Sequence, residues 1–234
     1  MKKVVIILFT LLLAAPVFSQ TDKKKAPNLP AFDQKKLHFG FLIGFNTLDF
    51  RVINSGKTSY YADVITLKPG LNIGIVSDLR LNKHFNLRFL PGISFGQRDL
   101  FYYTSTASSN NEDDKKTTLK IKSTFLEFPL VVKFSGKRMH NAKPFITAGG
   151  NTRYDLAKNK QDGLLLRSLD FYAEAGAGFD FYMTYFRFAV ELKASIGFAN
   201  MLNPAGTDKP EDEVYTKTID ALKSRVFSLT FYFE

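Results

Sequence analysis

The clearest structural signal in the chain is DFYAEAGAGFDFYMTYFRFAVELKASIGFANM, residues Asp170–Met201. Read with a period of two, residues 170–182 place polar and charged side chains on one face and Phe and Ala side chains on the other. Residues 186–198 alternate in the same way, with Arg187, Glu191 and Lys193 on one face. Two alternating segments joined at Thr184 predict a β-hairpin. Each strand is about twice the usual length and suits a transmembrane β-strand, which needs about 9–11 residues.

The same alternation recurs elsewhere and predicts eight strands in all. The expected strands cover residues 37–49, 71–81, 85–98, 126–134, 146–155, 170–183, 186–199 and 227–233. Long polar connections, 51–66, 104–118, 156–169 and 202–222, follow the odd-numbered strands, and short turns follow the even-numbered ones. An even strand number with all long loops at one end is the layout of outer-membrane barrels. Pro129, inside the fourth expected strand, predicts a bulge or a local break there.

Alternation alone does not say which face of a barrel points outward, because a soluble lipocalin-like barrel has eight strands with an apolar interior. The distribution of glycine distinguishes the two arrangements. Gly150 lies on the apolar face, whereas the charged face carries Gly40, Gly44, Gly74, Gly92, Gly96, Gly149, Gly176, Gly178 and Gly197. The lumen of an eight-stranded barrel is only just wide enough for side chains, so long charged side chains there need neighbours without bulk. The alternative reading is that these glycines mark bulges in a soluble barrel.

We therefore predict an all-β fold, an eight-stranded antiparallel up-and-down transmembrane β-barrel with a filled polar lumen. The expected lumen charge network comprises Asp78, Arg80, Arg88, Glu127, Lys133, Arg153, Glu174, Asp180, Arg187, Glu191 and Lys193, and Arg98 and Asp155 share their face. Because an unpaired buried charge is very costly, a mutually paired ionic plug is favoured over an ion or proton path. A one-residue slip of the strand 186–199 would turn three charges to lipid, at about 2–4 kcal/mol per basic residue near the midplane.

The chain begins MKKVVIILFTLLLAAPVFSQ, with a basic start, an apolar run and a plausible cut before Gln20. The apolar run is shorter than the roughly 20 residues of a spanning helix, so residues 1–19 are predicted to be a secretory signal peptide and not a membrane anchor. Residues 20–36 are Lys-rich and interrupted by proline, which predicts a flexible basic periplasmic tail. Residues 37–234 then form the outer-membrane barrel. The chain has no Cys, which excludes disulfides, thiol catalysis and lipid attachment at a cleaved Cys.

The chain is basic, with 32 Lys and Arg against 22 Asp and Glu. An exported protein seldom meets nucleic acid, so the expected partners are outer-membrane lipid and acidic proteins or cell wall. The cations concentrate in the tail and in the short turns at Lys83, Lys137 and Arg138, whereas two long loops are acidic at residues 112–114 and 211–213. This charge is either merely solvating or forms a docking face for acidic partners at the basic periplasmic end.

No motif marks a catalytic, cofactor or metal site. His38, His84 and His140 are scattered over a strand and two turns, without the close spacing of metal ligands. The chain has no Gly-x-Ser-x-Gly, Gly-rich phosphate loop or His-Glu-x-x-His motif. Glu174 and Glu191 on neighbouring strands could mimic a hydrolase dyad, but the same spacing is expected of a salt-bridge network. We expect no enzymatic activity, no cofactor, no metal and no small-molecule substrate.

Several extended stretches resemble the PorT family of outer-membrane β-barrel proteins. They are LHFGFLIGFNTLDF, LKPGLNIGIVSDLRLNKHFNLRFLPGISFGQRDLFY, STFLEFPLVVKF, the hairpin with the following ML, and the terminal LKSRVFSLTFYFE, so that the resemblance spans Leu37–Glu234. The family is associated with the type IX secretion system, which exports proteins across the outer membrane and serves surface adhesins and gliding motility. The resemblance implies an accessory role in that assembly. The chain ends in Phe233-Glu234 and not in an aromatic residue, which makes its assembly signal atypical.

Three functions remain open on the sequence. The favoured one is a non-enzymatic component of a protein-export machinery, integral to the bacterial outer membrane, with both termini in the periplasm. Its partners would be other secretion-system proteins at the basic periplasmic end. The second is a small surface barrel for adhesion or envelope protection that acts through its outer loops. The third is a narrow channel or a barrel enzyme.

Overall fold

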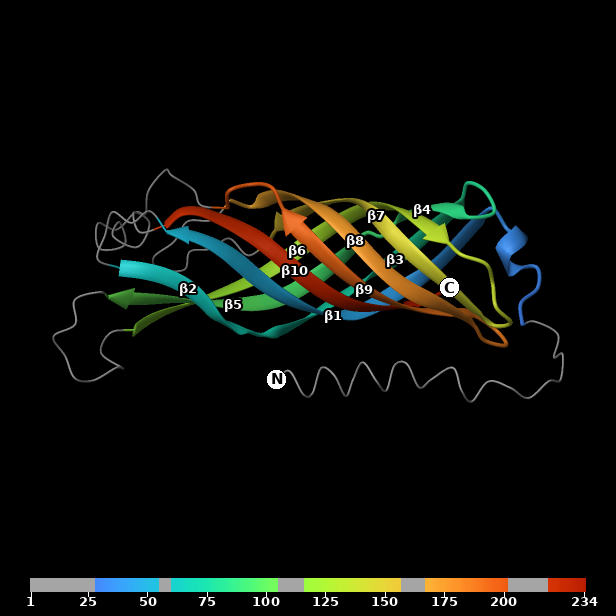
Figure 1. Ribbon diagram of the computed structural model, residues 1–234, viewed down its shortest axis with the longest axis horizontal. Coiled ribbons are helices and arrows are strands. Elements are labelled where there is room, and N and C mark those ends of the chain that lie inside the picture. Colours follow the sequence, from blue (N-terminus) through green and yellow to red (C-terminus); the bar gives the residue numbers. More distant parts are fainter. Residues whose placement is uncertain (1–27, 55–59, 105–115, 157–166, 202–218) are drawn as a thin grey trace.

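The computed structural model describes residues 28–54, 60–104, 116–156, 167–201 and 219–234, without the side chains of 60–67, 98–104 and 116–121. They contain the 3-10 helix η2 (Phe32–Gln34) and the strands β1 (Leu37–Asn54), β2 (Tyr60–Leu67), β3 (Pro69–Arg80), β4 (Phe85–Phe89), β5 (Gly92–Thr104), β6 (Lys116–Ser135), β7 (Ala142–Asp155), β8 (Leu169–Tyr182), β9 (Arg187–Gly197) and β10 (Ile219–Phe233). The strands form one elongated barrel (Figure 1). Among these residues no helix has the length and apolarity to cross a bilayer.

The sheet closes on itself. Antiparallel neighbours follow the order β1-β10-β9-β8-β7-β6, and the other side of β1 pairs with β3. β2 and β3 share one position in the ring, and β4 and β5 share another, so the ten strands of the described residues fill eight positions. Where β1 pairs with β3, closure pairs the backbone polar groups without a free edge, as a sheet in hydrocarbon requires. The predicted eight-stranded up-and-down barrel is confirmed.

The two ends of the barrel differ. At the short-turn end, residues 81–84, 136–141 and 183–186 join β3 to β4, β6 to β7 and β8 to β9. The other end, which we call the loop end, lies where β1, β5, β7 and β9 finish (Figure 1). Here the predicted connection at 51–66 is wrong, because β1 continues to Asn54 and β2 already begins at Tyr60. The sequence is continuously polar only between these strand residues, at SGKTS (55–59), and the flanking residues do not alternate cleanly enough to be predicted as strands.

Pro129 does not produce the predicted bulge in its own strand. β6 pairs with β7 in one unbroken register from Phe125 to Ser135. The interruption lies on the facing strand, between β4 and β5, where the Leu90 N–H donates to the Pro129 carbonyl at 3.0 Å. Pro129 has no N–H to donate back and Pro91 also lacks one, so the ladder loses two donors at this point while the carbonyls of both prolines accept hydrogen bonds and the register is kept.

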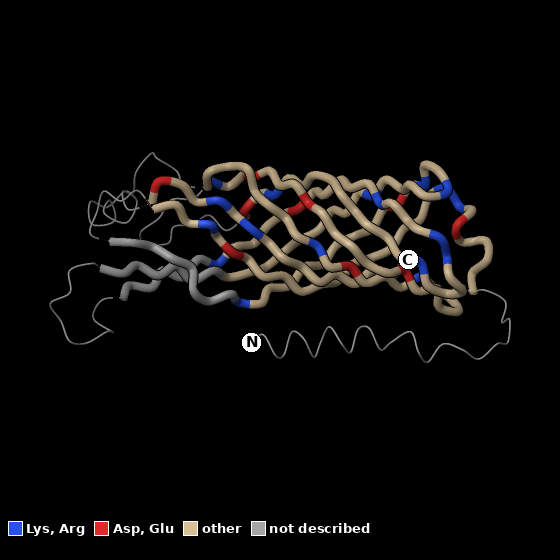
Figure 2. The backbone as a smooth tube through the Cα atoms, in the orientation of Figure 1, with Lys and Arg blue, Asp and Glu red and all other residues tan. Residues whose placement is uncertain are grey.

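The apolar face of the strands points outward, as predicted. Phe39 is 64% exposed and Leu192 is 67% exposed, whereas Arg88, Lys133 and Asp180 are 0% exposed. Charged positions lie along the length of the barrel and not only at its ends (Figure 2). This pattern is the reverse of a soluble barrel, whose apolar side chains would be inside. The lumen also contains two apolar clusters that the predicted charge network did not include, around Tyr232 and Tyr172.

The glycines provide the space that the lumen charges need. A Cβ added to Gly149, on the lumen side of β7, would lie 2.6 Å from the Val131 Cα. A Cβ on the adjacent Gly150, which faces outward, would meet only the Tyr172 carbonyl oxygen, at 3.6 Å. A Cβ on Gly176 would lie 2.5 Å from a carboxylate oxygen of Glu191. The glycine argument for a filled lumen is therefore confirmed.

Candidate functional site

The lumen at the short-turn end contains a cluster of ion pairs that the last residue completes. Asp78 lies 2.9 Å from Nη2 of Arg187 and 3.4 Å from Nε of Arg88. The Glu234 carboxylate accepts a hydrogen bond from Nη2 of Arg88 at 2.6 Å and another from Arg187. Lys133 donates to both oxygens of Asp180, at 2.7 and 2.8 Å. We call these six residues the turn-end cluster.

The turn-end cluster is balanced, because three cationic side chains face three carboxylates. Its members come from β3, β4, β6, β8, β9 and the C-terminal residue, so it ties almost the whole circumference together. Ionised side chains this deep are stable only when each has a partner with good geometry. The arrangement therefore acts chemically as a closed plug of paired ions.

A second group of ions, the central cluster, lies further along the lumen and comprises Glu127, Arg153, Glu174 and Lys193. Arg153 contacts Glu127 at 3.1 Å and Glu174 at 3.3 Å, and Lys193 lies 3.1 Å from the other oxygen of Glu174. Asn151 and Ser195 donate hydrogen bonds to Glu174 at 2.8 and 2.9 Å. Glu174 is thus held by four side chains, and both of its carboxylate oxygens have partners.

Glu191 occupies the lumen wall between the two clusters. Its carboxylate accepts hydrogen bonds from the hydroxyls of Thr147 and Tyr232. Glu191 and Glu174 therefore have separate sets of partners, and Lys193 lies at Glu174. The predicted salt-bridge network with Arg187 and Lys193 is therefore met at Glu174 through Lys193, whereas the hydroxyl groups that donate to Glu191 are neutral.

Aromatic rings cover three of the lumen cations. The Arg88 guanidinium lies 4.3 Å from the Tyr232 ring centroid, and Arg153 lies 4.4 Å from that of Tyr172. Lys133 lies 4.0 Å from the Phe145 ring centroid. Such contacts stabilise a desolvated cation by about 2 kcal/mol. Sequence reasoning missed these rings as partners of the charges, although strand alternation had placed Tyr172 and Tyr232 on the polar face.

Glu234 was also missed, and a signal for it was present. Ser228, Thr230 and Tyr232 occupy the lumen face of β10, and continuing the period of two places Glu234 on the same face. Arg80, in contrast, was predicted to belong to the lumen charge network and does not. Its Nε donates to the Asn82 carbonyl at the short-turn end, and among the described residues it belongs to neither cluster. Asp155 lies in the lumen, and the Arg98 side chain is outside the described residues.

The histidines do not converge. His38 bonds to the Phe32 carbonyl, His84 bonds to the Ser135 carbonyl, and His140 lies in a turn with a φ of 53°. No group of three or more His, Cys, Asp or Glu side chains within the described ranges could hold a metal ion.

The prediction that the fold begins at Leu37 needs correction, because residues 28–36 close the lumen at the short-turn end. The Asp33 carboxylate accepts a hydrogen bond from the Tyr182 hydroxyl at 2.8 Å and lies 3.6 Å from Lys143 and 4.0 Å from Arg138. Phe32 stacks on His38 with ring centroids 4.3 Å apart. We call residues 28–36 the plug segment. The residues that contact it form what we call the mouth: His38, Arg138, Asn141, Lys143, Tyr182 and Arg187. Such polar sequences lack the periodicity that predicts order, so the docking site was not visible from the chain.

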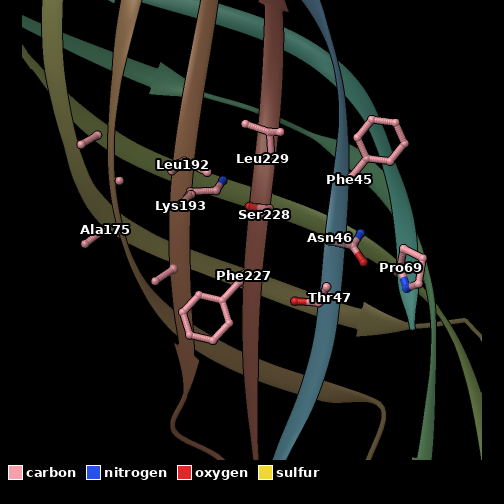
Figure 3. A pocket seen from close by; sticks show the side chains of 13 residues that line it. Phe45, Asn46, Thr47, Pro69, Ala175, Leu192, Lys193, Phe227, Ser228 and Leu229 are labelled. Atoms are coloured by element: carbon pink, nitrogen blue, oxygen red, sulfur yellow. The ribbon is translucent and has the colours of Figure 1, made fainter. Parts of the chain in front are cut away.

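The outer wall has a shallow apolar hollow over β8, β9, β10, β1 and β3 (Figure 3). Ala175 and Ala194 pair across β8 and β9, and the larger side chains of Phe227 and Leu229 lie on β10. Since these side chains belong to the lipid-facing surface, the hollow is a place for acyl chains.

Comparison with known families decides the class of the protein. A family model described as outer membrane protein beta-barrel domain matches residues 18–203. The chain belongs to this family. This outer-membrane β-barrel protein is accordingly an integral protein of the bacterial outer membrane. The comparison with curated proteins gave no match.

Several solved structures resemble this outer-membrane β-barrel protein. Neisserial surface protein A is 11% identical, with a TM-score of 0.42, over 85% of this chain and 98% of that one. OprG from Pseudomonas aeruginosa is 13% identical, with a TM-score of 0.41, over 85% of this chain and 92% of that one. Ail, the attachment invasion locus protein of Yersinia pestis, was solved in complex with a heparin analogue. It is 12% identical, with a TM-score of 0.36, over 85% of this chain and 99% of that one.

Proposed function

We propose that this protein is a non-enzymatic accessory component of a protein-export machinery, of the type IX secretion kind that also serves gliding motility. The observation that carries the proposal is the filled lumen, because a barrel closed by paired ions is suited to contact partners and not to pass cargo. The extended resemblance to the PorT family from Leu37 to Glu234 supports the particular machinery. No nucleophile or cofactor motif in the sequence supports an enzyme.

The short-turn end faces the periplasm in this proposal, together with both termini. Outer-membrane barrels have short periplasmic turns and longer outer loops. This end carries Lys83, Lys137, Arg138 and Lys143, of which the first two are exposed. A basic surface attracts acidic partners and raises their association rate. We therefore place the contact with other secretion proteins here.

Deletion of the gene in a strain with this export system tests the proposal. Export of surface proteins should fail without the barrel and recover with the wild-type chain. Affinity capture of the intact envelope complex, with and without residues 20–36, should recover secretion proteins that depend on the short-turn end. Normal export in the deletion strain, with the barrel absent from the complex, would contradict the proposal.

A small surface barrel for adhesion or envelope protection is the second candidate. The observation that favours it is strand length, since β6 has 20 residues and β8 has 14, against the about 9–11 needed to cross the membrane. β2, β5 and β6 project beyond the rest of the barrel at the loop end (Figure 1). Deleting residues 203–220, with their acidic stretch, separates the two candidates: export persists in the first and adhesion is lost in the second.

A further inference from the structure

The mouth recognises the plug segment as it would a separate peptide. The Asn28 N–H donates to Oδ1 of Asn141 at 2.9 Å, and the Asn28 amide donates to the Tyr182 carbonyl at 3.0 Å. Arg138 donates to the Asn28 carbonyl, and His38 bonds to the Phe32 carbonyl at 2.9 Å. Backbone groups at the start and in the middle of the segment are thus satisfied by residues of the barrel and its turns, which is how peptide-binding proteins obtain affinity independent of side chains.

Two adjacent side chains provide the specificity. The Phe32 ring lies between three groups, with the His38 ring at 4.3 Å, the Tyr182 ring edge-on at 6.2 Å and the Arg187 guanidinium at 4.9 Å. Asp33 receives the Tyr182 hydroxyl and two cations of the mouth. Within the described residues, the ion pairs of Arg138 and Lys143 are both with Asp33. If the plug segment left, this end would have two unpaired cations beside an empty aromatic slot.

A narrow gap, about the size of one water molecule, remains beside the plug segment in the mouth. Arg80, Lys83 and Asn86 also line this small cavity beside Asp33. Among the described residues, no ion pair is formed by Arg80 or Lys83. His38, only 7% exposed, also lines this cavity, and its Nδ1 has no hydrogen-bond partner within the described part of the chain. Leu29 has a φ of 49°, a left-handed conformation that is unfavourable for a residue other than glycine.

We propose that the mouth is a peptide-binding site for a partner polypeptide with an aromatic residue followed by an acidic one, and that the plug segment occupies it in the same chain. That the partner is a secretion protein rests on the proposed function. That the mouth binds a peptide rests on the geometry alone. The partner gains an advantage over the plug segment by placing a longer or a second carboxylate beside Arg80 and Lys83. It must overcome a tethered competitor whose effective concentration is in the millimolar range.

Binding of a labelled peptide to the full mature chain in detergent tests the inference. The probe is the fluorescein-labelled heptapeptide NLPAFDQ, residues 28–34, with a blocked C-terminus. The variant Phe32→Ala/Asp33→Asn, which releases the plug segment, should bind the probe at least tenfold more tightly than the wild type. Adding Arg138→Gln to that variant should abolish the gain, whereas adding Lys137→Gln, a change at the adjacent exposed cation, should not.

Three controls make the result specific. A probe in which Asp33 is Asn should lose most of the affinity, and a scrambled probe of the same charge should not bind. A probe in which Asp33 is Glu should bind at least as well as the original, since Arg80 and Lys83 lie beside Asp33 and a longer carboxylate reaches toward them. Equal binding of the original and scrambled probes, or no binding to the released mouth, would overturn the inference. A doubled particle mass of the barrel without probe would also overturn it, because the occupant would then be a second copy.

A second measurement uses the wild-type chain in case the released variant folds poorly. The chain has no native Cys, so a spin label at Ala31→Cys, on the exposed side of the plug segment, is specific. Excess probe should convert part of the immobilised spectrum to a mobile one, and an unchanged spectrum would contradict displacement. Normal export by cells with Arg138→Gln would count against the proposed function but leave peptide binding in detergent intact. Loss of export in these cells, with no peptide binding in detergent, would support the proposed function and contradict the peptide-binding site.

Discussion

The carboxylate of Glu234, the last residue, accepts a hydrogen bond at 2.6 Å from Arg88, which lies 146 residues earlier in the chain. The two side chains are 0% exposed. The end of the final strand is therefore anchored inside the barrel by charge, and on the outside Phe233 stacks on Phe41 of the first strand at 4.8 Å. The pairing of β10 with β1 that closes the barrel therefore also brings Glu234 into the turn-end cluster.

Glu234→Gln should destabilise the folded barrel by about 3–5 kcal/mol, since two buried arginines lose a shared counter-charge. The free energy of unfolding, measured by urea titration in lipid vesicles, reports the change. Asp220→Asn is the matched control, because Asp220 is an exposed carboxylate on the same strand. Similar stability of the two variants would show that Glu234 does not hold the cluster.

The Lys133–Asp180 pair permits a double-mutant cycle. Asp180→Leu alone leaves a buried ammonium without its counter-charge and should cost about 3–5 kcal/mol, and Lys133→Met alone leaves a buried carboxylate in the same position. Replacing both partners with apolar residues, Lys133→Met and Asp180→Leu, should recover much of that loss, because neither desolvated charge remains. The coupling energy comes from the four unfolding free energies. If the loss in the double variant equals the sum of the two single losses, the coupling energy is zero and the two side chains do not stabilise each other.

Gly149 and Gly150 are neighbours on opposite faces of β7. Gly149→Ala should destabilise the barrel by about 1–3 kcal/mol, because its Cβ has no room against β6 in the lumen. Gly150→Ala should change the free energy of unfolding by no more than about 0.5 kcal/mol, since that Cβ would make only an ordinary van der Waals contact with the Tyr172 carbonyl oxygen. Equal losses would show that both faces of β7 are equally packed.

Leu192, in the middle of β9, faces outward and is 67% exposed. Leu192→Arg should cost about 2–4 kcal/mol in a lipid bilayer, where the midplane does not solvate a cation. The same change at Tyr185, 90% exposed in the turn before β9, should have little effect. Unfolding in vesicles and fractionation of cells measure the two variants. A mature chain that stays soluble without detergent would exclude the membrane barrel altogether.

The lumen should not conduct. In planar bilayers the wild-type barrel should show no steady stepwise current, because the turn-end cluster and the apolar layer around Tyr232 fill the cross-section. Stable unitary steps that persist across preparations would favour the channel hypothesis instead.

Much of the barrel was predictable because a strand in a membrane barrel must alternate at every step. Phe171 and Asp180 lie on the faces that the alternation predicted, and the short turn between β8 and β9 fixes the register of this one pair. The alternation also predicted that the charged side chains lie in the lumen. It did not predict which charged side chains pair with one another. Which cation meets which carboxylate depends on how far neighbouring strands are staggered, and alternation carries no information on that stagger.

The sequence by itself determined the strand faces, the alternation of long and short connections, and the separation of charge from lipid, because each depends only on the local period of two. The tertiary structure alone decided that Glu234 completes the turn-end cluster, that Pro129 interrupts the facing strand, and that the segment around Asp33 closes the mouth. These contacts join residues far apart in the chain. They exist only once the sheet has closed into a cylinder, which brings side chains from opposite walls within reach.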